Sequence, residues 1–406
     1  MEKKLGKMFS GFKKGLLLFT VLMLIALPSS VFAGDPKIKT MTRNLYLGAD
    51  SFKVVEAAQT DPDSIPYAVA DVYQTMLYTN FWERAEALAD EIALFEPDVI
   101  GLQEVFTYYI QTPGDFIFGN PVQANTVVID FYSVLDAALQ MRGMDYTAFT
   151  VTNADIEMPM ADLNAGPPYY LSDIRLVDHD VILVREDHVA SNEYKGNYQY
   201  QLELDLGGTS VAFTRGYIAL DVNIKGDDFR FVNTHLEVRS APGSVFRVFQ
   251  AAQMEELLGT IDYLSGLFDS KPVVMVGDFN SSSEDVPGES YVPDGQGGYV
   301  LMPYVPPYMM AIDAGYKDSW LEQKKYGDSF TSGFDEYVSD PTAELTSRID
   351  LIFLDPKDLE IDKVKARVVG NKVEDMTPSG FWPSDHAGVV AKVKFDGEFK
   401  LQVHHE

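Results

Sequence analysis

The sequence predicts a layered α/β protein, and three observations lead to that class. Apolar segments of strand length recur along the chain and are bounded by Gly, Pro, Asn or Asp. Two longer segments repeat apolar residues with helical spacing. No change of composition marks a linker, and the sequence shows no internal repeat. Many strands with a few long helices are typical of sheets covered by helices, so we expect one domain of this kind.

Helical spacing is clearest over residues 81–98 and 245–267. In the first segment Phe81, Leu88 and Ile92 fall on one face, and Pro97 marks the end. The second segment repeats this pattern over its whole length. Both are predicted to be amphipathic helices that cover a sheet.

Strand-like segments are more numerous than helices. Several alternate apolar and polar residues, and several are apolar throughout, as in strands buried between layers. They are residues 38–47, 98–103, 179–185, 216–224, 229–236, 272–278, 348–354, 364–370 and 386–395. Residues 51–80 are rich in helix formers but weakly patterned. Residues 286–310, which combine Gly and Pro with Tyr and Met, are predicted to be a long loop near the substrate or a plain surface loop.

Polar side chains lie at the ends of several predicted strands. Some follow an apolar segment and others precede one. Those that follow are Asn44, Glu104, His235, Asp278 and Asn280, and those that precede are Asp350, Asp385 and His386. Because the end of one strand and the start of its antiparallel neighbour share an edge, we expect these side chains to converge on one rim of the sheets.

The chemistry of these side chains suits a metal-assisted reaction. Carboxylates and amides offer the oxygen ligands that Mg²⁺, Mn²⁺ and Ca²⁺ prefer, and imidazoles titrate near neutral pH. The metal would neutralise a phosphate oxygen, one imidazole would accept a proton from water, and another group would stabilise the leaving oxygen. Taken singly, each residue has a structural alternative, such as a turn at Asn44 or a helix cap at Asp278.

The first 33 residues have the order of a signal peptide. Five Lys accompany the start of an apolar run at residues 15–27, and Val31 and Ala33 supply small side chains where signal peptidase reads. We expect cleavage before Gly34 and a secreted or periplasmic protein of one catalytic domain, residues 34–406. The apolar run is shorter than the roughly 20 residues of a transmembrane helix, so we expect no stable membrane anchor.

Cysteine content and charge exclude several classes of function. The chain has no Cys, which excludes a thiolate nucleophile, a zinc–thiolate site and a lipid anchor on Cys. Cleavage would remove five Lys and one Glu, taking the formal net charge from −29 to −33. Such a charge disfavours loose binding to polyanions, although a metal ion can reverse the potential locally. We expect a monomer without an obligate protein partner.

Several segments together resemble motifs of the endonuclease/exonuclease/phosphatase superfamily, which has the deoxyribonuclease I-like fold. They are TRNLYL, DVIGLQEV, FVNTHLE, VVMVGDFN, SRIDLIFL and PSDHAGVVAKV, in family order and spacing. Arg247 and Gln250, and the segment DAGYKDSW at 313–320, agree as well. The resemblance extends from about residue 39 to 395. It implies a four-layer α/β sandwich of two packed, mainly antiparallel β-sheets flanked by helices.

The resemblance also implies how the chain would hold a metal ion and a phosphate. Glu104, with Asn44 and Asp385, would bind the divalent metal, with Mg²⁺ as the first expectation and Mn²⁺ or Ca²⁺ as alternatives. Arg185 and Arg215 lie near positions where family members place phosphate-contacting residues. The motifs around these two arginines are loose.

The remaining residues at the rim would carry the reaction. By the same resemblance, Asp278 and Asn280 would face the scissile phosphate and the nucleophile. His386 would contact the phosphate and be oriented by Asp350. His235 would complete an acid/base pair with it.

The motifs predict a phosphoesterase without selecting its substrate. Among exported members, a nuclease and a phospholipid or sphingomyelin phosphodiesterase are the main alternatives, and a phosphomonoester remains open. The acidic chain and the Tyr- and Met-rich segment slightly favour a neutral or zwitterionic lipid. A different class is a noncatalytic or toxin-like binding protein that retains the fold. Such a protein should have lost site positions, and none is missing here.

Overall fold

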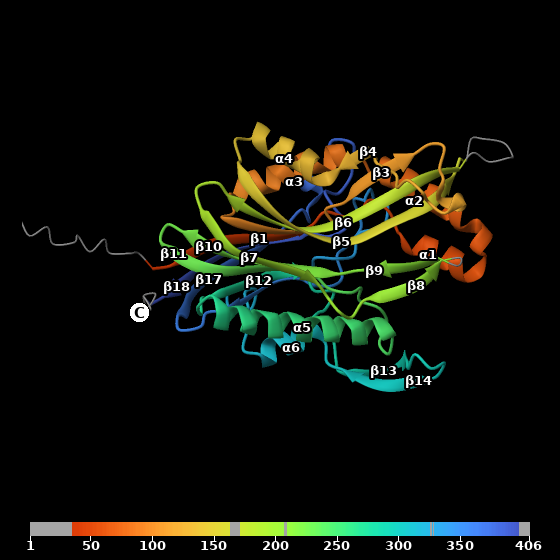
Figure 1. Cartoon of the computed structure of the whole chain (residues 1–406). Coiled ribbons are helices and arrows are strands. Elements are labelled where there is room, and N and C mark those ends of the chain that lie inside the picture. The colour runs from red at the N-terminus through yellow and green to blue at the C-terminus, as the bar shows by residue number, and fades with distance from the viewer. Residues whose placement is uncertain (1–34, 163–170, 207–208, 325–326, 328, 398–406) are drawn as a thin grey trace, which may run out of the picture. The chain divides into compact units, whose positions relative to one another are not determined.

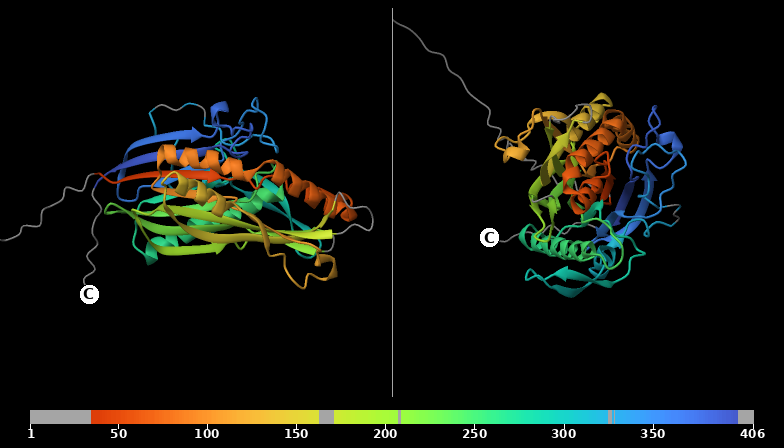
Figure 2. Two further views of the ribbon diagram at one scale, coloured as in Figure 1. Left: turned by 90° about the horizontal axis from the view of Figure 1, so that it is seen from above. Right: turned by 90° about the vertical axis from the view of Figure 1, so that its right-hand side faces the viewer.

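Two β-sheets lie face to face in the computed structural model, with helices on their outer faces (Figures 1 and 2). The structure describes residues 35–162, 171–206, 209–324, 327 and 329–397, so the predicted signal peptide lies outside the described residues. No helix in these residues is long and apolar enough to cross a membrane. The predicted α/β class and its layers are confirmed.

The larger sheet has eight strands and contains both termini of the described fold. All its pairs are antiparallel except β1 and β2, which run parallel. Its order is β17 (Glu360–Val369), β18 (Gly388–Asp396), β1 (Lys37–Asn44), β2 (Val99–Gln103), β6 (Leu171–Arg185), β3 (Thr107–Gln111) and β4 (Thr126–Asp130), with β5 (Tyr146–Ala161) paired to β6.

The smaller sheet has six strands, of which only β11 and β12 run parallel. Both sheets are therefore mixed, with mainly antiparallel pairs. The order is β15 (Lys317–Asp318), β16 (Asp350–Asp355), β12 (Val273–Asp278), β11 (Asp227–His235), β10 (Gly216–Ile224) and β7 (Val189–Asn197). Two hairpins stand apart, β8 (Leu202–Leu206) with β9 (Thr209–Phe213) and β13 (Gly288–Pro293) with β14 (Tyr299–Tyr304).

Helices cover the outer face of each sheet, and both predicted helices are confirmed. The larger sheet carries α1 (Phe52–Thr60), α2 (Ile65–Tyr78), α3 (Phe81–Phe95) and α4 (Phe131–Met141), and the smaller carries α5 (Val245–Leu267) and α6 (Pro307–Asp313). Helix α3 ends where Glu96 adopts a φ of 45° before Pro97. Helix α5 begins after Ser244, whose side chain accepts a hydrogen bond from Phe246 N.

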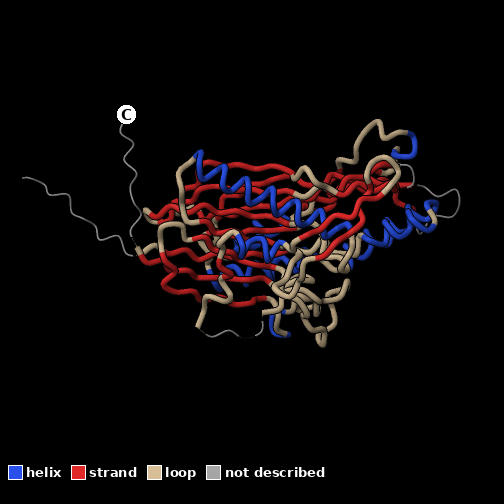
Figure 3. Tube along the Cα trace, turned by 90° about the horizontal axis from the view of Figure 1, so that it is seen from below, coloured by secondary structure: helices blue, strands red, loops and turns tan. Residues whose placement is uncertain are grey.

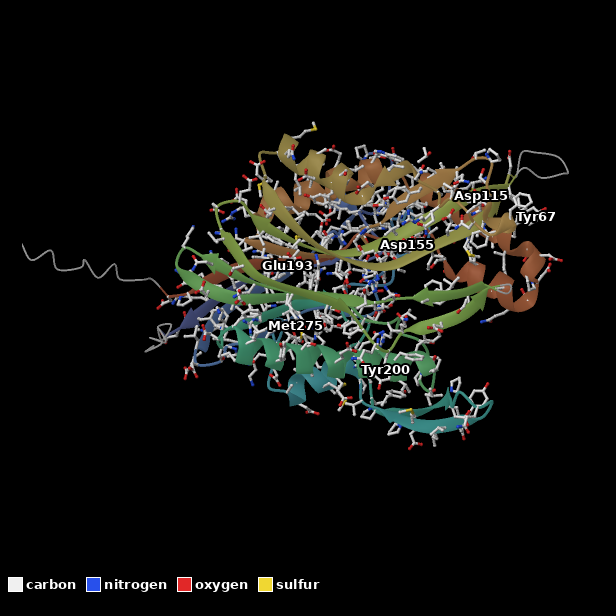
Figure 4. All side chains as sticks on the ribbon, viewed as in Figure 1. Tyr67, Asp115, Asp155, Glu193, Tyr200 and Met275 are labelled. Atoms are coloured by element: carbon white, nitrogen blue, oxygen red, sulfur yellow. The ribbon has the colours of Figure 1, made fainter. Side chains whose placement is uncertain are left out.

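Apolar cores fill the spaces between the layers. Met41, Leu88 and Leu183 belong to the core between the larger sheet and its helices. A second core fills the space between the two sheets. A third, which includes Met275 of β12 (labelled in Figure 4), lies between the smaller sheet and α5. Alternate residues of the central strands face different cores, as in the predicted doubly buried strands.

Polar contacts join the sheets beside the strand ends. Asn233 of β11 donates from Nδ2 to the carbonyls of Leu102 (2.9 Å) and Val181 (3.1 Å), and its Oδ1 accepts from Gln103 Nε2 (2.7 Å). Gly101 allows this approach, because an added Cβ would lie 2.6 Å from Asn233 Oδ1. These contacts fix strands of one sheet relative to the other next to the rim.

The prediction of a long loop at residues 286–310 is wrong. The segment forms hairpin β13–β14 and the start of α6, where Tyr308 is buried and donates to Asp318 Oδ2 (2.9 Å). The alternation of Tyr291, Val292 and Pro293 was too short to signal a strand beside so many Gly and Pro residues. Elsewhere loops gather toward one end of the strands (Figure 3).

Candidate active site

Strand pairing places the predicted residues at one rim. His235 is the register partner of Asp278 in the parallel pair β11–β12, and Asp278 is the partner of Asp350 in the antiparallel pair β12–β16. In the larger sheet, Asn44 pairs with Gln103, which directly precedes Glu104. Ends and starts of strands therefore meet at one edge.

Glu104 is held by hydrogen bonds from the end of β1. Asn44 Nδ2 donates to its Oε1 (3.1 Å), and Leu47 N donates to its Oε2 (2.7 Å). Asn44 is fixed in turn because its Oδ1 accepts from Tyr46 N (2.8 Å). The carboxylate and the amide are thus preorganised side by side.

Three residues at the rim adopt the left-handed backbone region that favours glycine. Tyr46 has a φ of 63°, Glu104 of 56° and Asn280 of 48°. Each costs of the order of 1–3 kcal/mol outside glycine and persists where the surroundings demand it. At Glu104 and Asn280 the side chain at this position contacts Asn44 and His235, respectively.

The donor set around Glu104 fits a divalent cation. Burial, followed by the charge of Asp385, raises the pKa of Glu104 to about 7, and burial also raises the pKa of Asp385. Asp385 Oδ1 accepts a long hydrogen bond from Ser384 Oγ (3.3 Å). Crowded carboxylates with raised pKa values are hard oxygen donors that a Mg²⁺-like ion would satisfy. Asn44 faces them with Nδ2, because its Oδ1 accepts from Tyr46 N, so in this arrangement it positions Glu104 rather than offering an oxygen.

His386 and Asp350 form a buried pair. Nδ1 of His386 donates to Asp350 Oδ2 at 2.8 Å, which fixes the ring and its proton. Burial alone would lower the pKa of His386, but Asp350, Asp385 and Asp278 together raise it well above 6.5. The raised pKa favours the protonated imidazole, in which Nε2 as well as Nδ1 carries a proton.

Asp278 links this pair to the other groups. Its Oδ2 accepts from Asn44 Nδ2 (3.3 Å) and lies 3.6 Å from His235 Nε2 and 3.7 Å from His386 Nδ1. Asp278, Asp350 and His386 bring one ligand atom each within 4.8 Å of one another. Because Nδ1 of His386 is already engaged by Asp350, we assign this triangle to proton transfer.

His235 lies between Arg215 and Asn280. Arg215 NH1 is 2.9 Å from its Nδ1, and Asn280 Nδ2 is 3.2 Å from its Nε2. Burial first, then the charges of Arg215 and His386, hold the pKa of His235 well below 6.5. The surroundings therefore shift the pKa values of the two histidines of the site in opposite directions.

Two buried arginines that the sequence analysis missed brace the rim. Arg84 of α3 donates to the carbonyls of Thr79, Leu45, Tyr46 and Pro383 at 2.7 to 3.2 Å, and burial lowers its pKa to about 10. It joins the segment after Asn44 to the segment before Asp385. Its helical position gave no signal beyond a charge within an amphipathic pattern.

Arg43 holds the backbone of His386 in place. It donates from Nε and NH2 to the Glu91 carboxylate (3.0 and 3.2 Å) and from NH1 to the carbonyl of His386. Both partners of this ion pair are buried. The backbone of His386 is thereby tied to α3.

Replacing Arg43 with Met should lower the free energy of unfolding by about 3–5 kcal/mol, because Glu91 is left buried and unpaired. Urea unfolding followed by circular dichroism measures this. The double variant Arg43→Met/Glu91→Leu should recover most of the loss. A single variant as stable as the parent would show that the pair contributes nothing.

The structure brings together nearly all the predicted residues, namely Asn44, Glu104, Arg215, His235, Asp278, Asn280, Asp350, Asp385 and His386.

The expectation for Arg185 is corrected. It lies at the opposite end of the sheet, where it binds Asp98 (2.8 Å) and Asp187 (2.7 Å). His188 is buried there against Asp98 (2.9 Å). Strand β2 separates this cluster from Glu104.

Comparison with known proteins identifies the class to which this fold and site belong. The family model described as the endonuclease/exonuclease/phosphatase family matches residues 79–386. The chain therefore belongs to this family, and it is a phosphoester hydrolase by class. No curated protein matches the chain in sequence.

Two solved structures show the same fold. An endonuclease/exonuclease/phosphatase family protein from Bacteroides thetaiotaomicron is 16% identical, with a TM-score of 0.52 over 91% of this chain and 98% of that one. A mannosyl-6-phosphatase from the same organism is 15% identical, with a TM-score of 0.50 over 89% and 100%. TDP2 from Caenorhabditis elegans is 17% identical, with a TM-score of 0.48 over 88% and 74%.

Proposed function

We propose that this chain is an exported, divalent-metal-dependent phosphoesterase that cleaves its substrate by attack of water. The observation that carries this proposal is the buried His386–Asp350 pair, whose neighbour Asp278 also accepts from Asn44 of the Glu104 cluster. Proton-transfer groups and oxygen ligands thus share one rim. Export remains an expectation from residues 1–33.

Differently charged side chains would take different roles in the reaction. A cation held by the carboxylates of Glu104 and Asp385, with Glu104 positioned by Asn44 Nδ2, would supply positive charge beside the phosphoryl oxygens. Burial, then Asp350, raises the pKa of Asp278 to about 7, which suits a carboxylate that orients water and accepts its proton.

The charged partners complete the reaction. His386, cationic and fixed by Asp350, donates from Nε2 toward the phosphoryl or leaving oxygen. Arg215 adds a second fixed positive charge. Water attack then needs no large rearrangement of these groups.

Hairpin β13–β14 favours a lipid as substrate. Tyr291, Tyr299 and Leu301 share one of its faces and are 65%, 70% and 45% exposed. Residues 281–310 contain no Lys, Arg or His, and several acids. Such a surface repels phosphate backbones but accommodates apolar chains and the quaternary ammonium of choline. We therefore propose a zwitterionic phospholipid or sphingomyelin headgroup, with nucleic acid as the second candidate.

A substrate panel tests the proposal. The purified protein is assayed with plasmid DNA, RNA, sphingomyelin, phosphatidylcholine, inositol phosphates and a mannose 6-phosphate ester, with Mg²⁺ or with a chelator. We expect Mg²⁺-dependent hydrolysis, greatest on a choline lipid. A folded protein inactive on the whole panel would favour the noncatalytic alternative instead.

Changing the apolar face of the hairpin should alter substrate choice without altering the chemical step. The variant Tyr291→Ser/Leu301→Ser should hydrolyse lipid vesicles about tenfold more slowly, the rate equivalent of ~1.4 kcal/mol of apolar contact. Its rate on a soluble chromogenic phosphodiester should be unchanged.

The matched control is Leu94→Ser/Met141→Ser, which removes exposed apolar side chains from the helices of the other layer. It should leave both rates unchanged. If the hairpin variant and this control behave alike on vesicles, the hairpin does not select the substrate.

A further inference from the structure

Arg215 lies over the face of the His235 ring. Its NH1 is 2.9 Å from Nδ1 and 3.4 Å from Nε2. A donor aligned with the in-plane lone pair of one ring nitrogen would be much farther from the other. NH1 of the guanidinium therefore lies over the face of the imidazole rather than in its plane, a contact that a neutral ring accepts and a cationic ring opposes.

The orientation of Asn280 defines what faces Nε2 of His235. Asn280 Oδ1 accepts from the backbone N of Arg239 (3.1 Å), and its Nδ2 donates to the carbonyl of Leu236 (3.2 Å). Because a backbone N can only donate, the amide cannot be flipped. Its Nδ2 is then the group 3.2 Å from Nε2, so this ring nitrogen accepts.

The charges around the ring keep Arg215 protonated. Burial opposes its charge, but Glu237, Asp178, Glu104 and Asp180 together raise its pKa. Glu237 Oε1 lies 4.0 Å from Nε of Arg215.

Other charged groups face His235 from three elements. Asp278 of β12 is 3.6 Å from Nε2, the Asp180 carboxylate of β6 lies at its backbone N, and the cationic His386 acts from before β18. The guanidinium over the ring and the amide at Nε2 both oppose protonation. Asp278 favours it from outside hydrogen-bond range.

We infer that His235 is a positioning residue whose neutral imidazole accepts from the Asn280 amide and carries the Arg215 guanidinium on its face. Proton transfer is then left to His386, Asp350 and Asp278. This role differs from the acid/base pair that the family resemblance implies. The assignment of proton transfer to these three residues rests on the proposed function. The neutral charge of the His235 ring does not.

Two substitutions separate positioning from proton transfer. His235→Gln keeps an acceptor for Asn280 and cannot exchange a proton at neutral pH, whereas His235→Ala keeps neither property. We expect His235→Gln to retain kcat within about tenfold, with the pH profile of the parent, and His235→Ala to fall well below it. If His235 were the general acid or base, both would lose roughly 10²-fold or more.

The activity outcomes decide the inference in both directions. Equal losses of that size in both variants, or the disappearance of one limb of the pH profile in His235→Gln, would overturn it. So would full activity in both variants, because Asn280 and Arg215 would then need no such support.

A second measurement does not depend on turnover. The chain has six His, so ¹⁵N-histidine labelling gives few signals, and the one that His235→Gln removes belongs to His235. We expect this ring to stay neutral from pH 6.5, the ordinary pKa of histidine, to pH 9, with Nε2 unprotonated. A ring that becomes charged in that range contradicts the inference. If the parent hydrolyses nothing, the proposed function fails and this titration alone decides the state of the ring.

Discussion

Replacing His386 with Ala is expected to lower kcat for phosphoester hydrolysis by roughly 10²-fold or more, with no recovery at high Mg²⁺. The ring is fixed by Asp350 at 2.8 Å, and three carboxylates hold its pKa well above 6.5. Its loss therefore removes a positioned cationic donor that added metal cannot replace. Steady-state rates across a Mg²⁺ titration measure this.

Asp350→Asn serves as the graded control for His386. The amide keeps the shape of Asp350 but loses the charge that favours the cationic ring. Its rate should fall between those of the parent and His386→Ala, and activity should decline at lower pH than in the parent, because the ring loses its proton more readily. Near-parental turnover in folded His386→Ala would show that the assigned proton chemistry is wrong.

Replacing Glu104 with Gln should impair metal use rather than proton transfer. The change keeps the shape of the side chain and removes a charged ligand next to Asn44 and Asp385. Activity should fall steeply at low Mg²⁺ and recover in part as Mg²⁺ rises, since mass action offsets a weakened site. Glu157→Gln is the matched control, because Glu157 is also buried and accepts from Asn120 Nδ2 (3.1 Å), which is not a residue of the site.

The raised pKa values predict how metal and pH act on stability. Glu104 and Asp278 both have a folded pKa of about 7, above the ordinary 4.5 and 3.8. The folded state therefore binds more protons between about pH 4 and 7, and stability without metal should fall as pH rises through that window. Mg²⁺ should raise Tm more at pH 8 than at pH 5. If Mg²⁺ raises the Tm of the Glu104→Gln variant as much as that of the parent, the metal binds at another site.

Patterns with a local cause were predictable from the sequence. The helix at 81–98 and the strand ends carrying Glu104 and Asp278 follow from apolar spacing, Pro97 and the position of each polar residue. The rim followed from them because strand direction determines which ends meet.

Features with distant partners were not predictable in this way. Arg43 and Arg84 look like ordinary charges until strands and loops remote in sequence supply their acceptors. Arg185 shows a second limit. It lies on the same strand as Asp178, but seven residues at about 3.3 Å each carry it to the far edge. Sequence proximity to a motif did not reveal at which edge a side chain would lie.

Hydrolysis in ¹⁸O-labelled water tests the central claim most directly, because the claim is that water attacks phosphorus at this rim. The parent with Mg²⁺ should release a phosphoryl product carrying one ¹⁸O, detected by mass spectrometry or ³¹P NMR. Chelation of the metal or the His386→Ala change should abolish it. Turnover of a substrate that leaves the phosphoryl product unlabelled, or labelled product that persists undiminished in His386→Ala, would contradict the account.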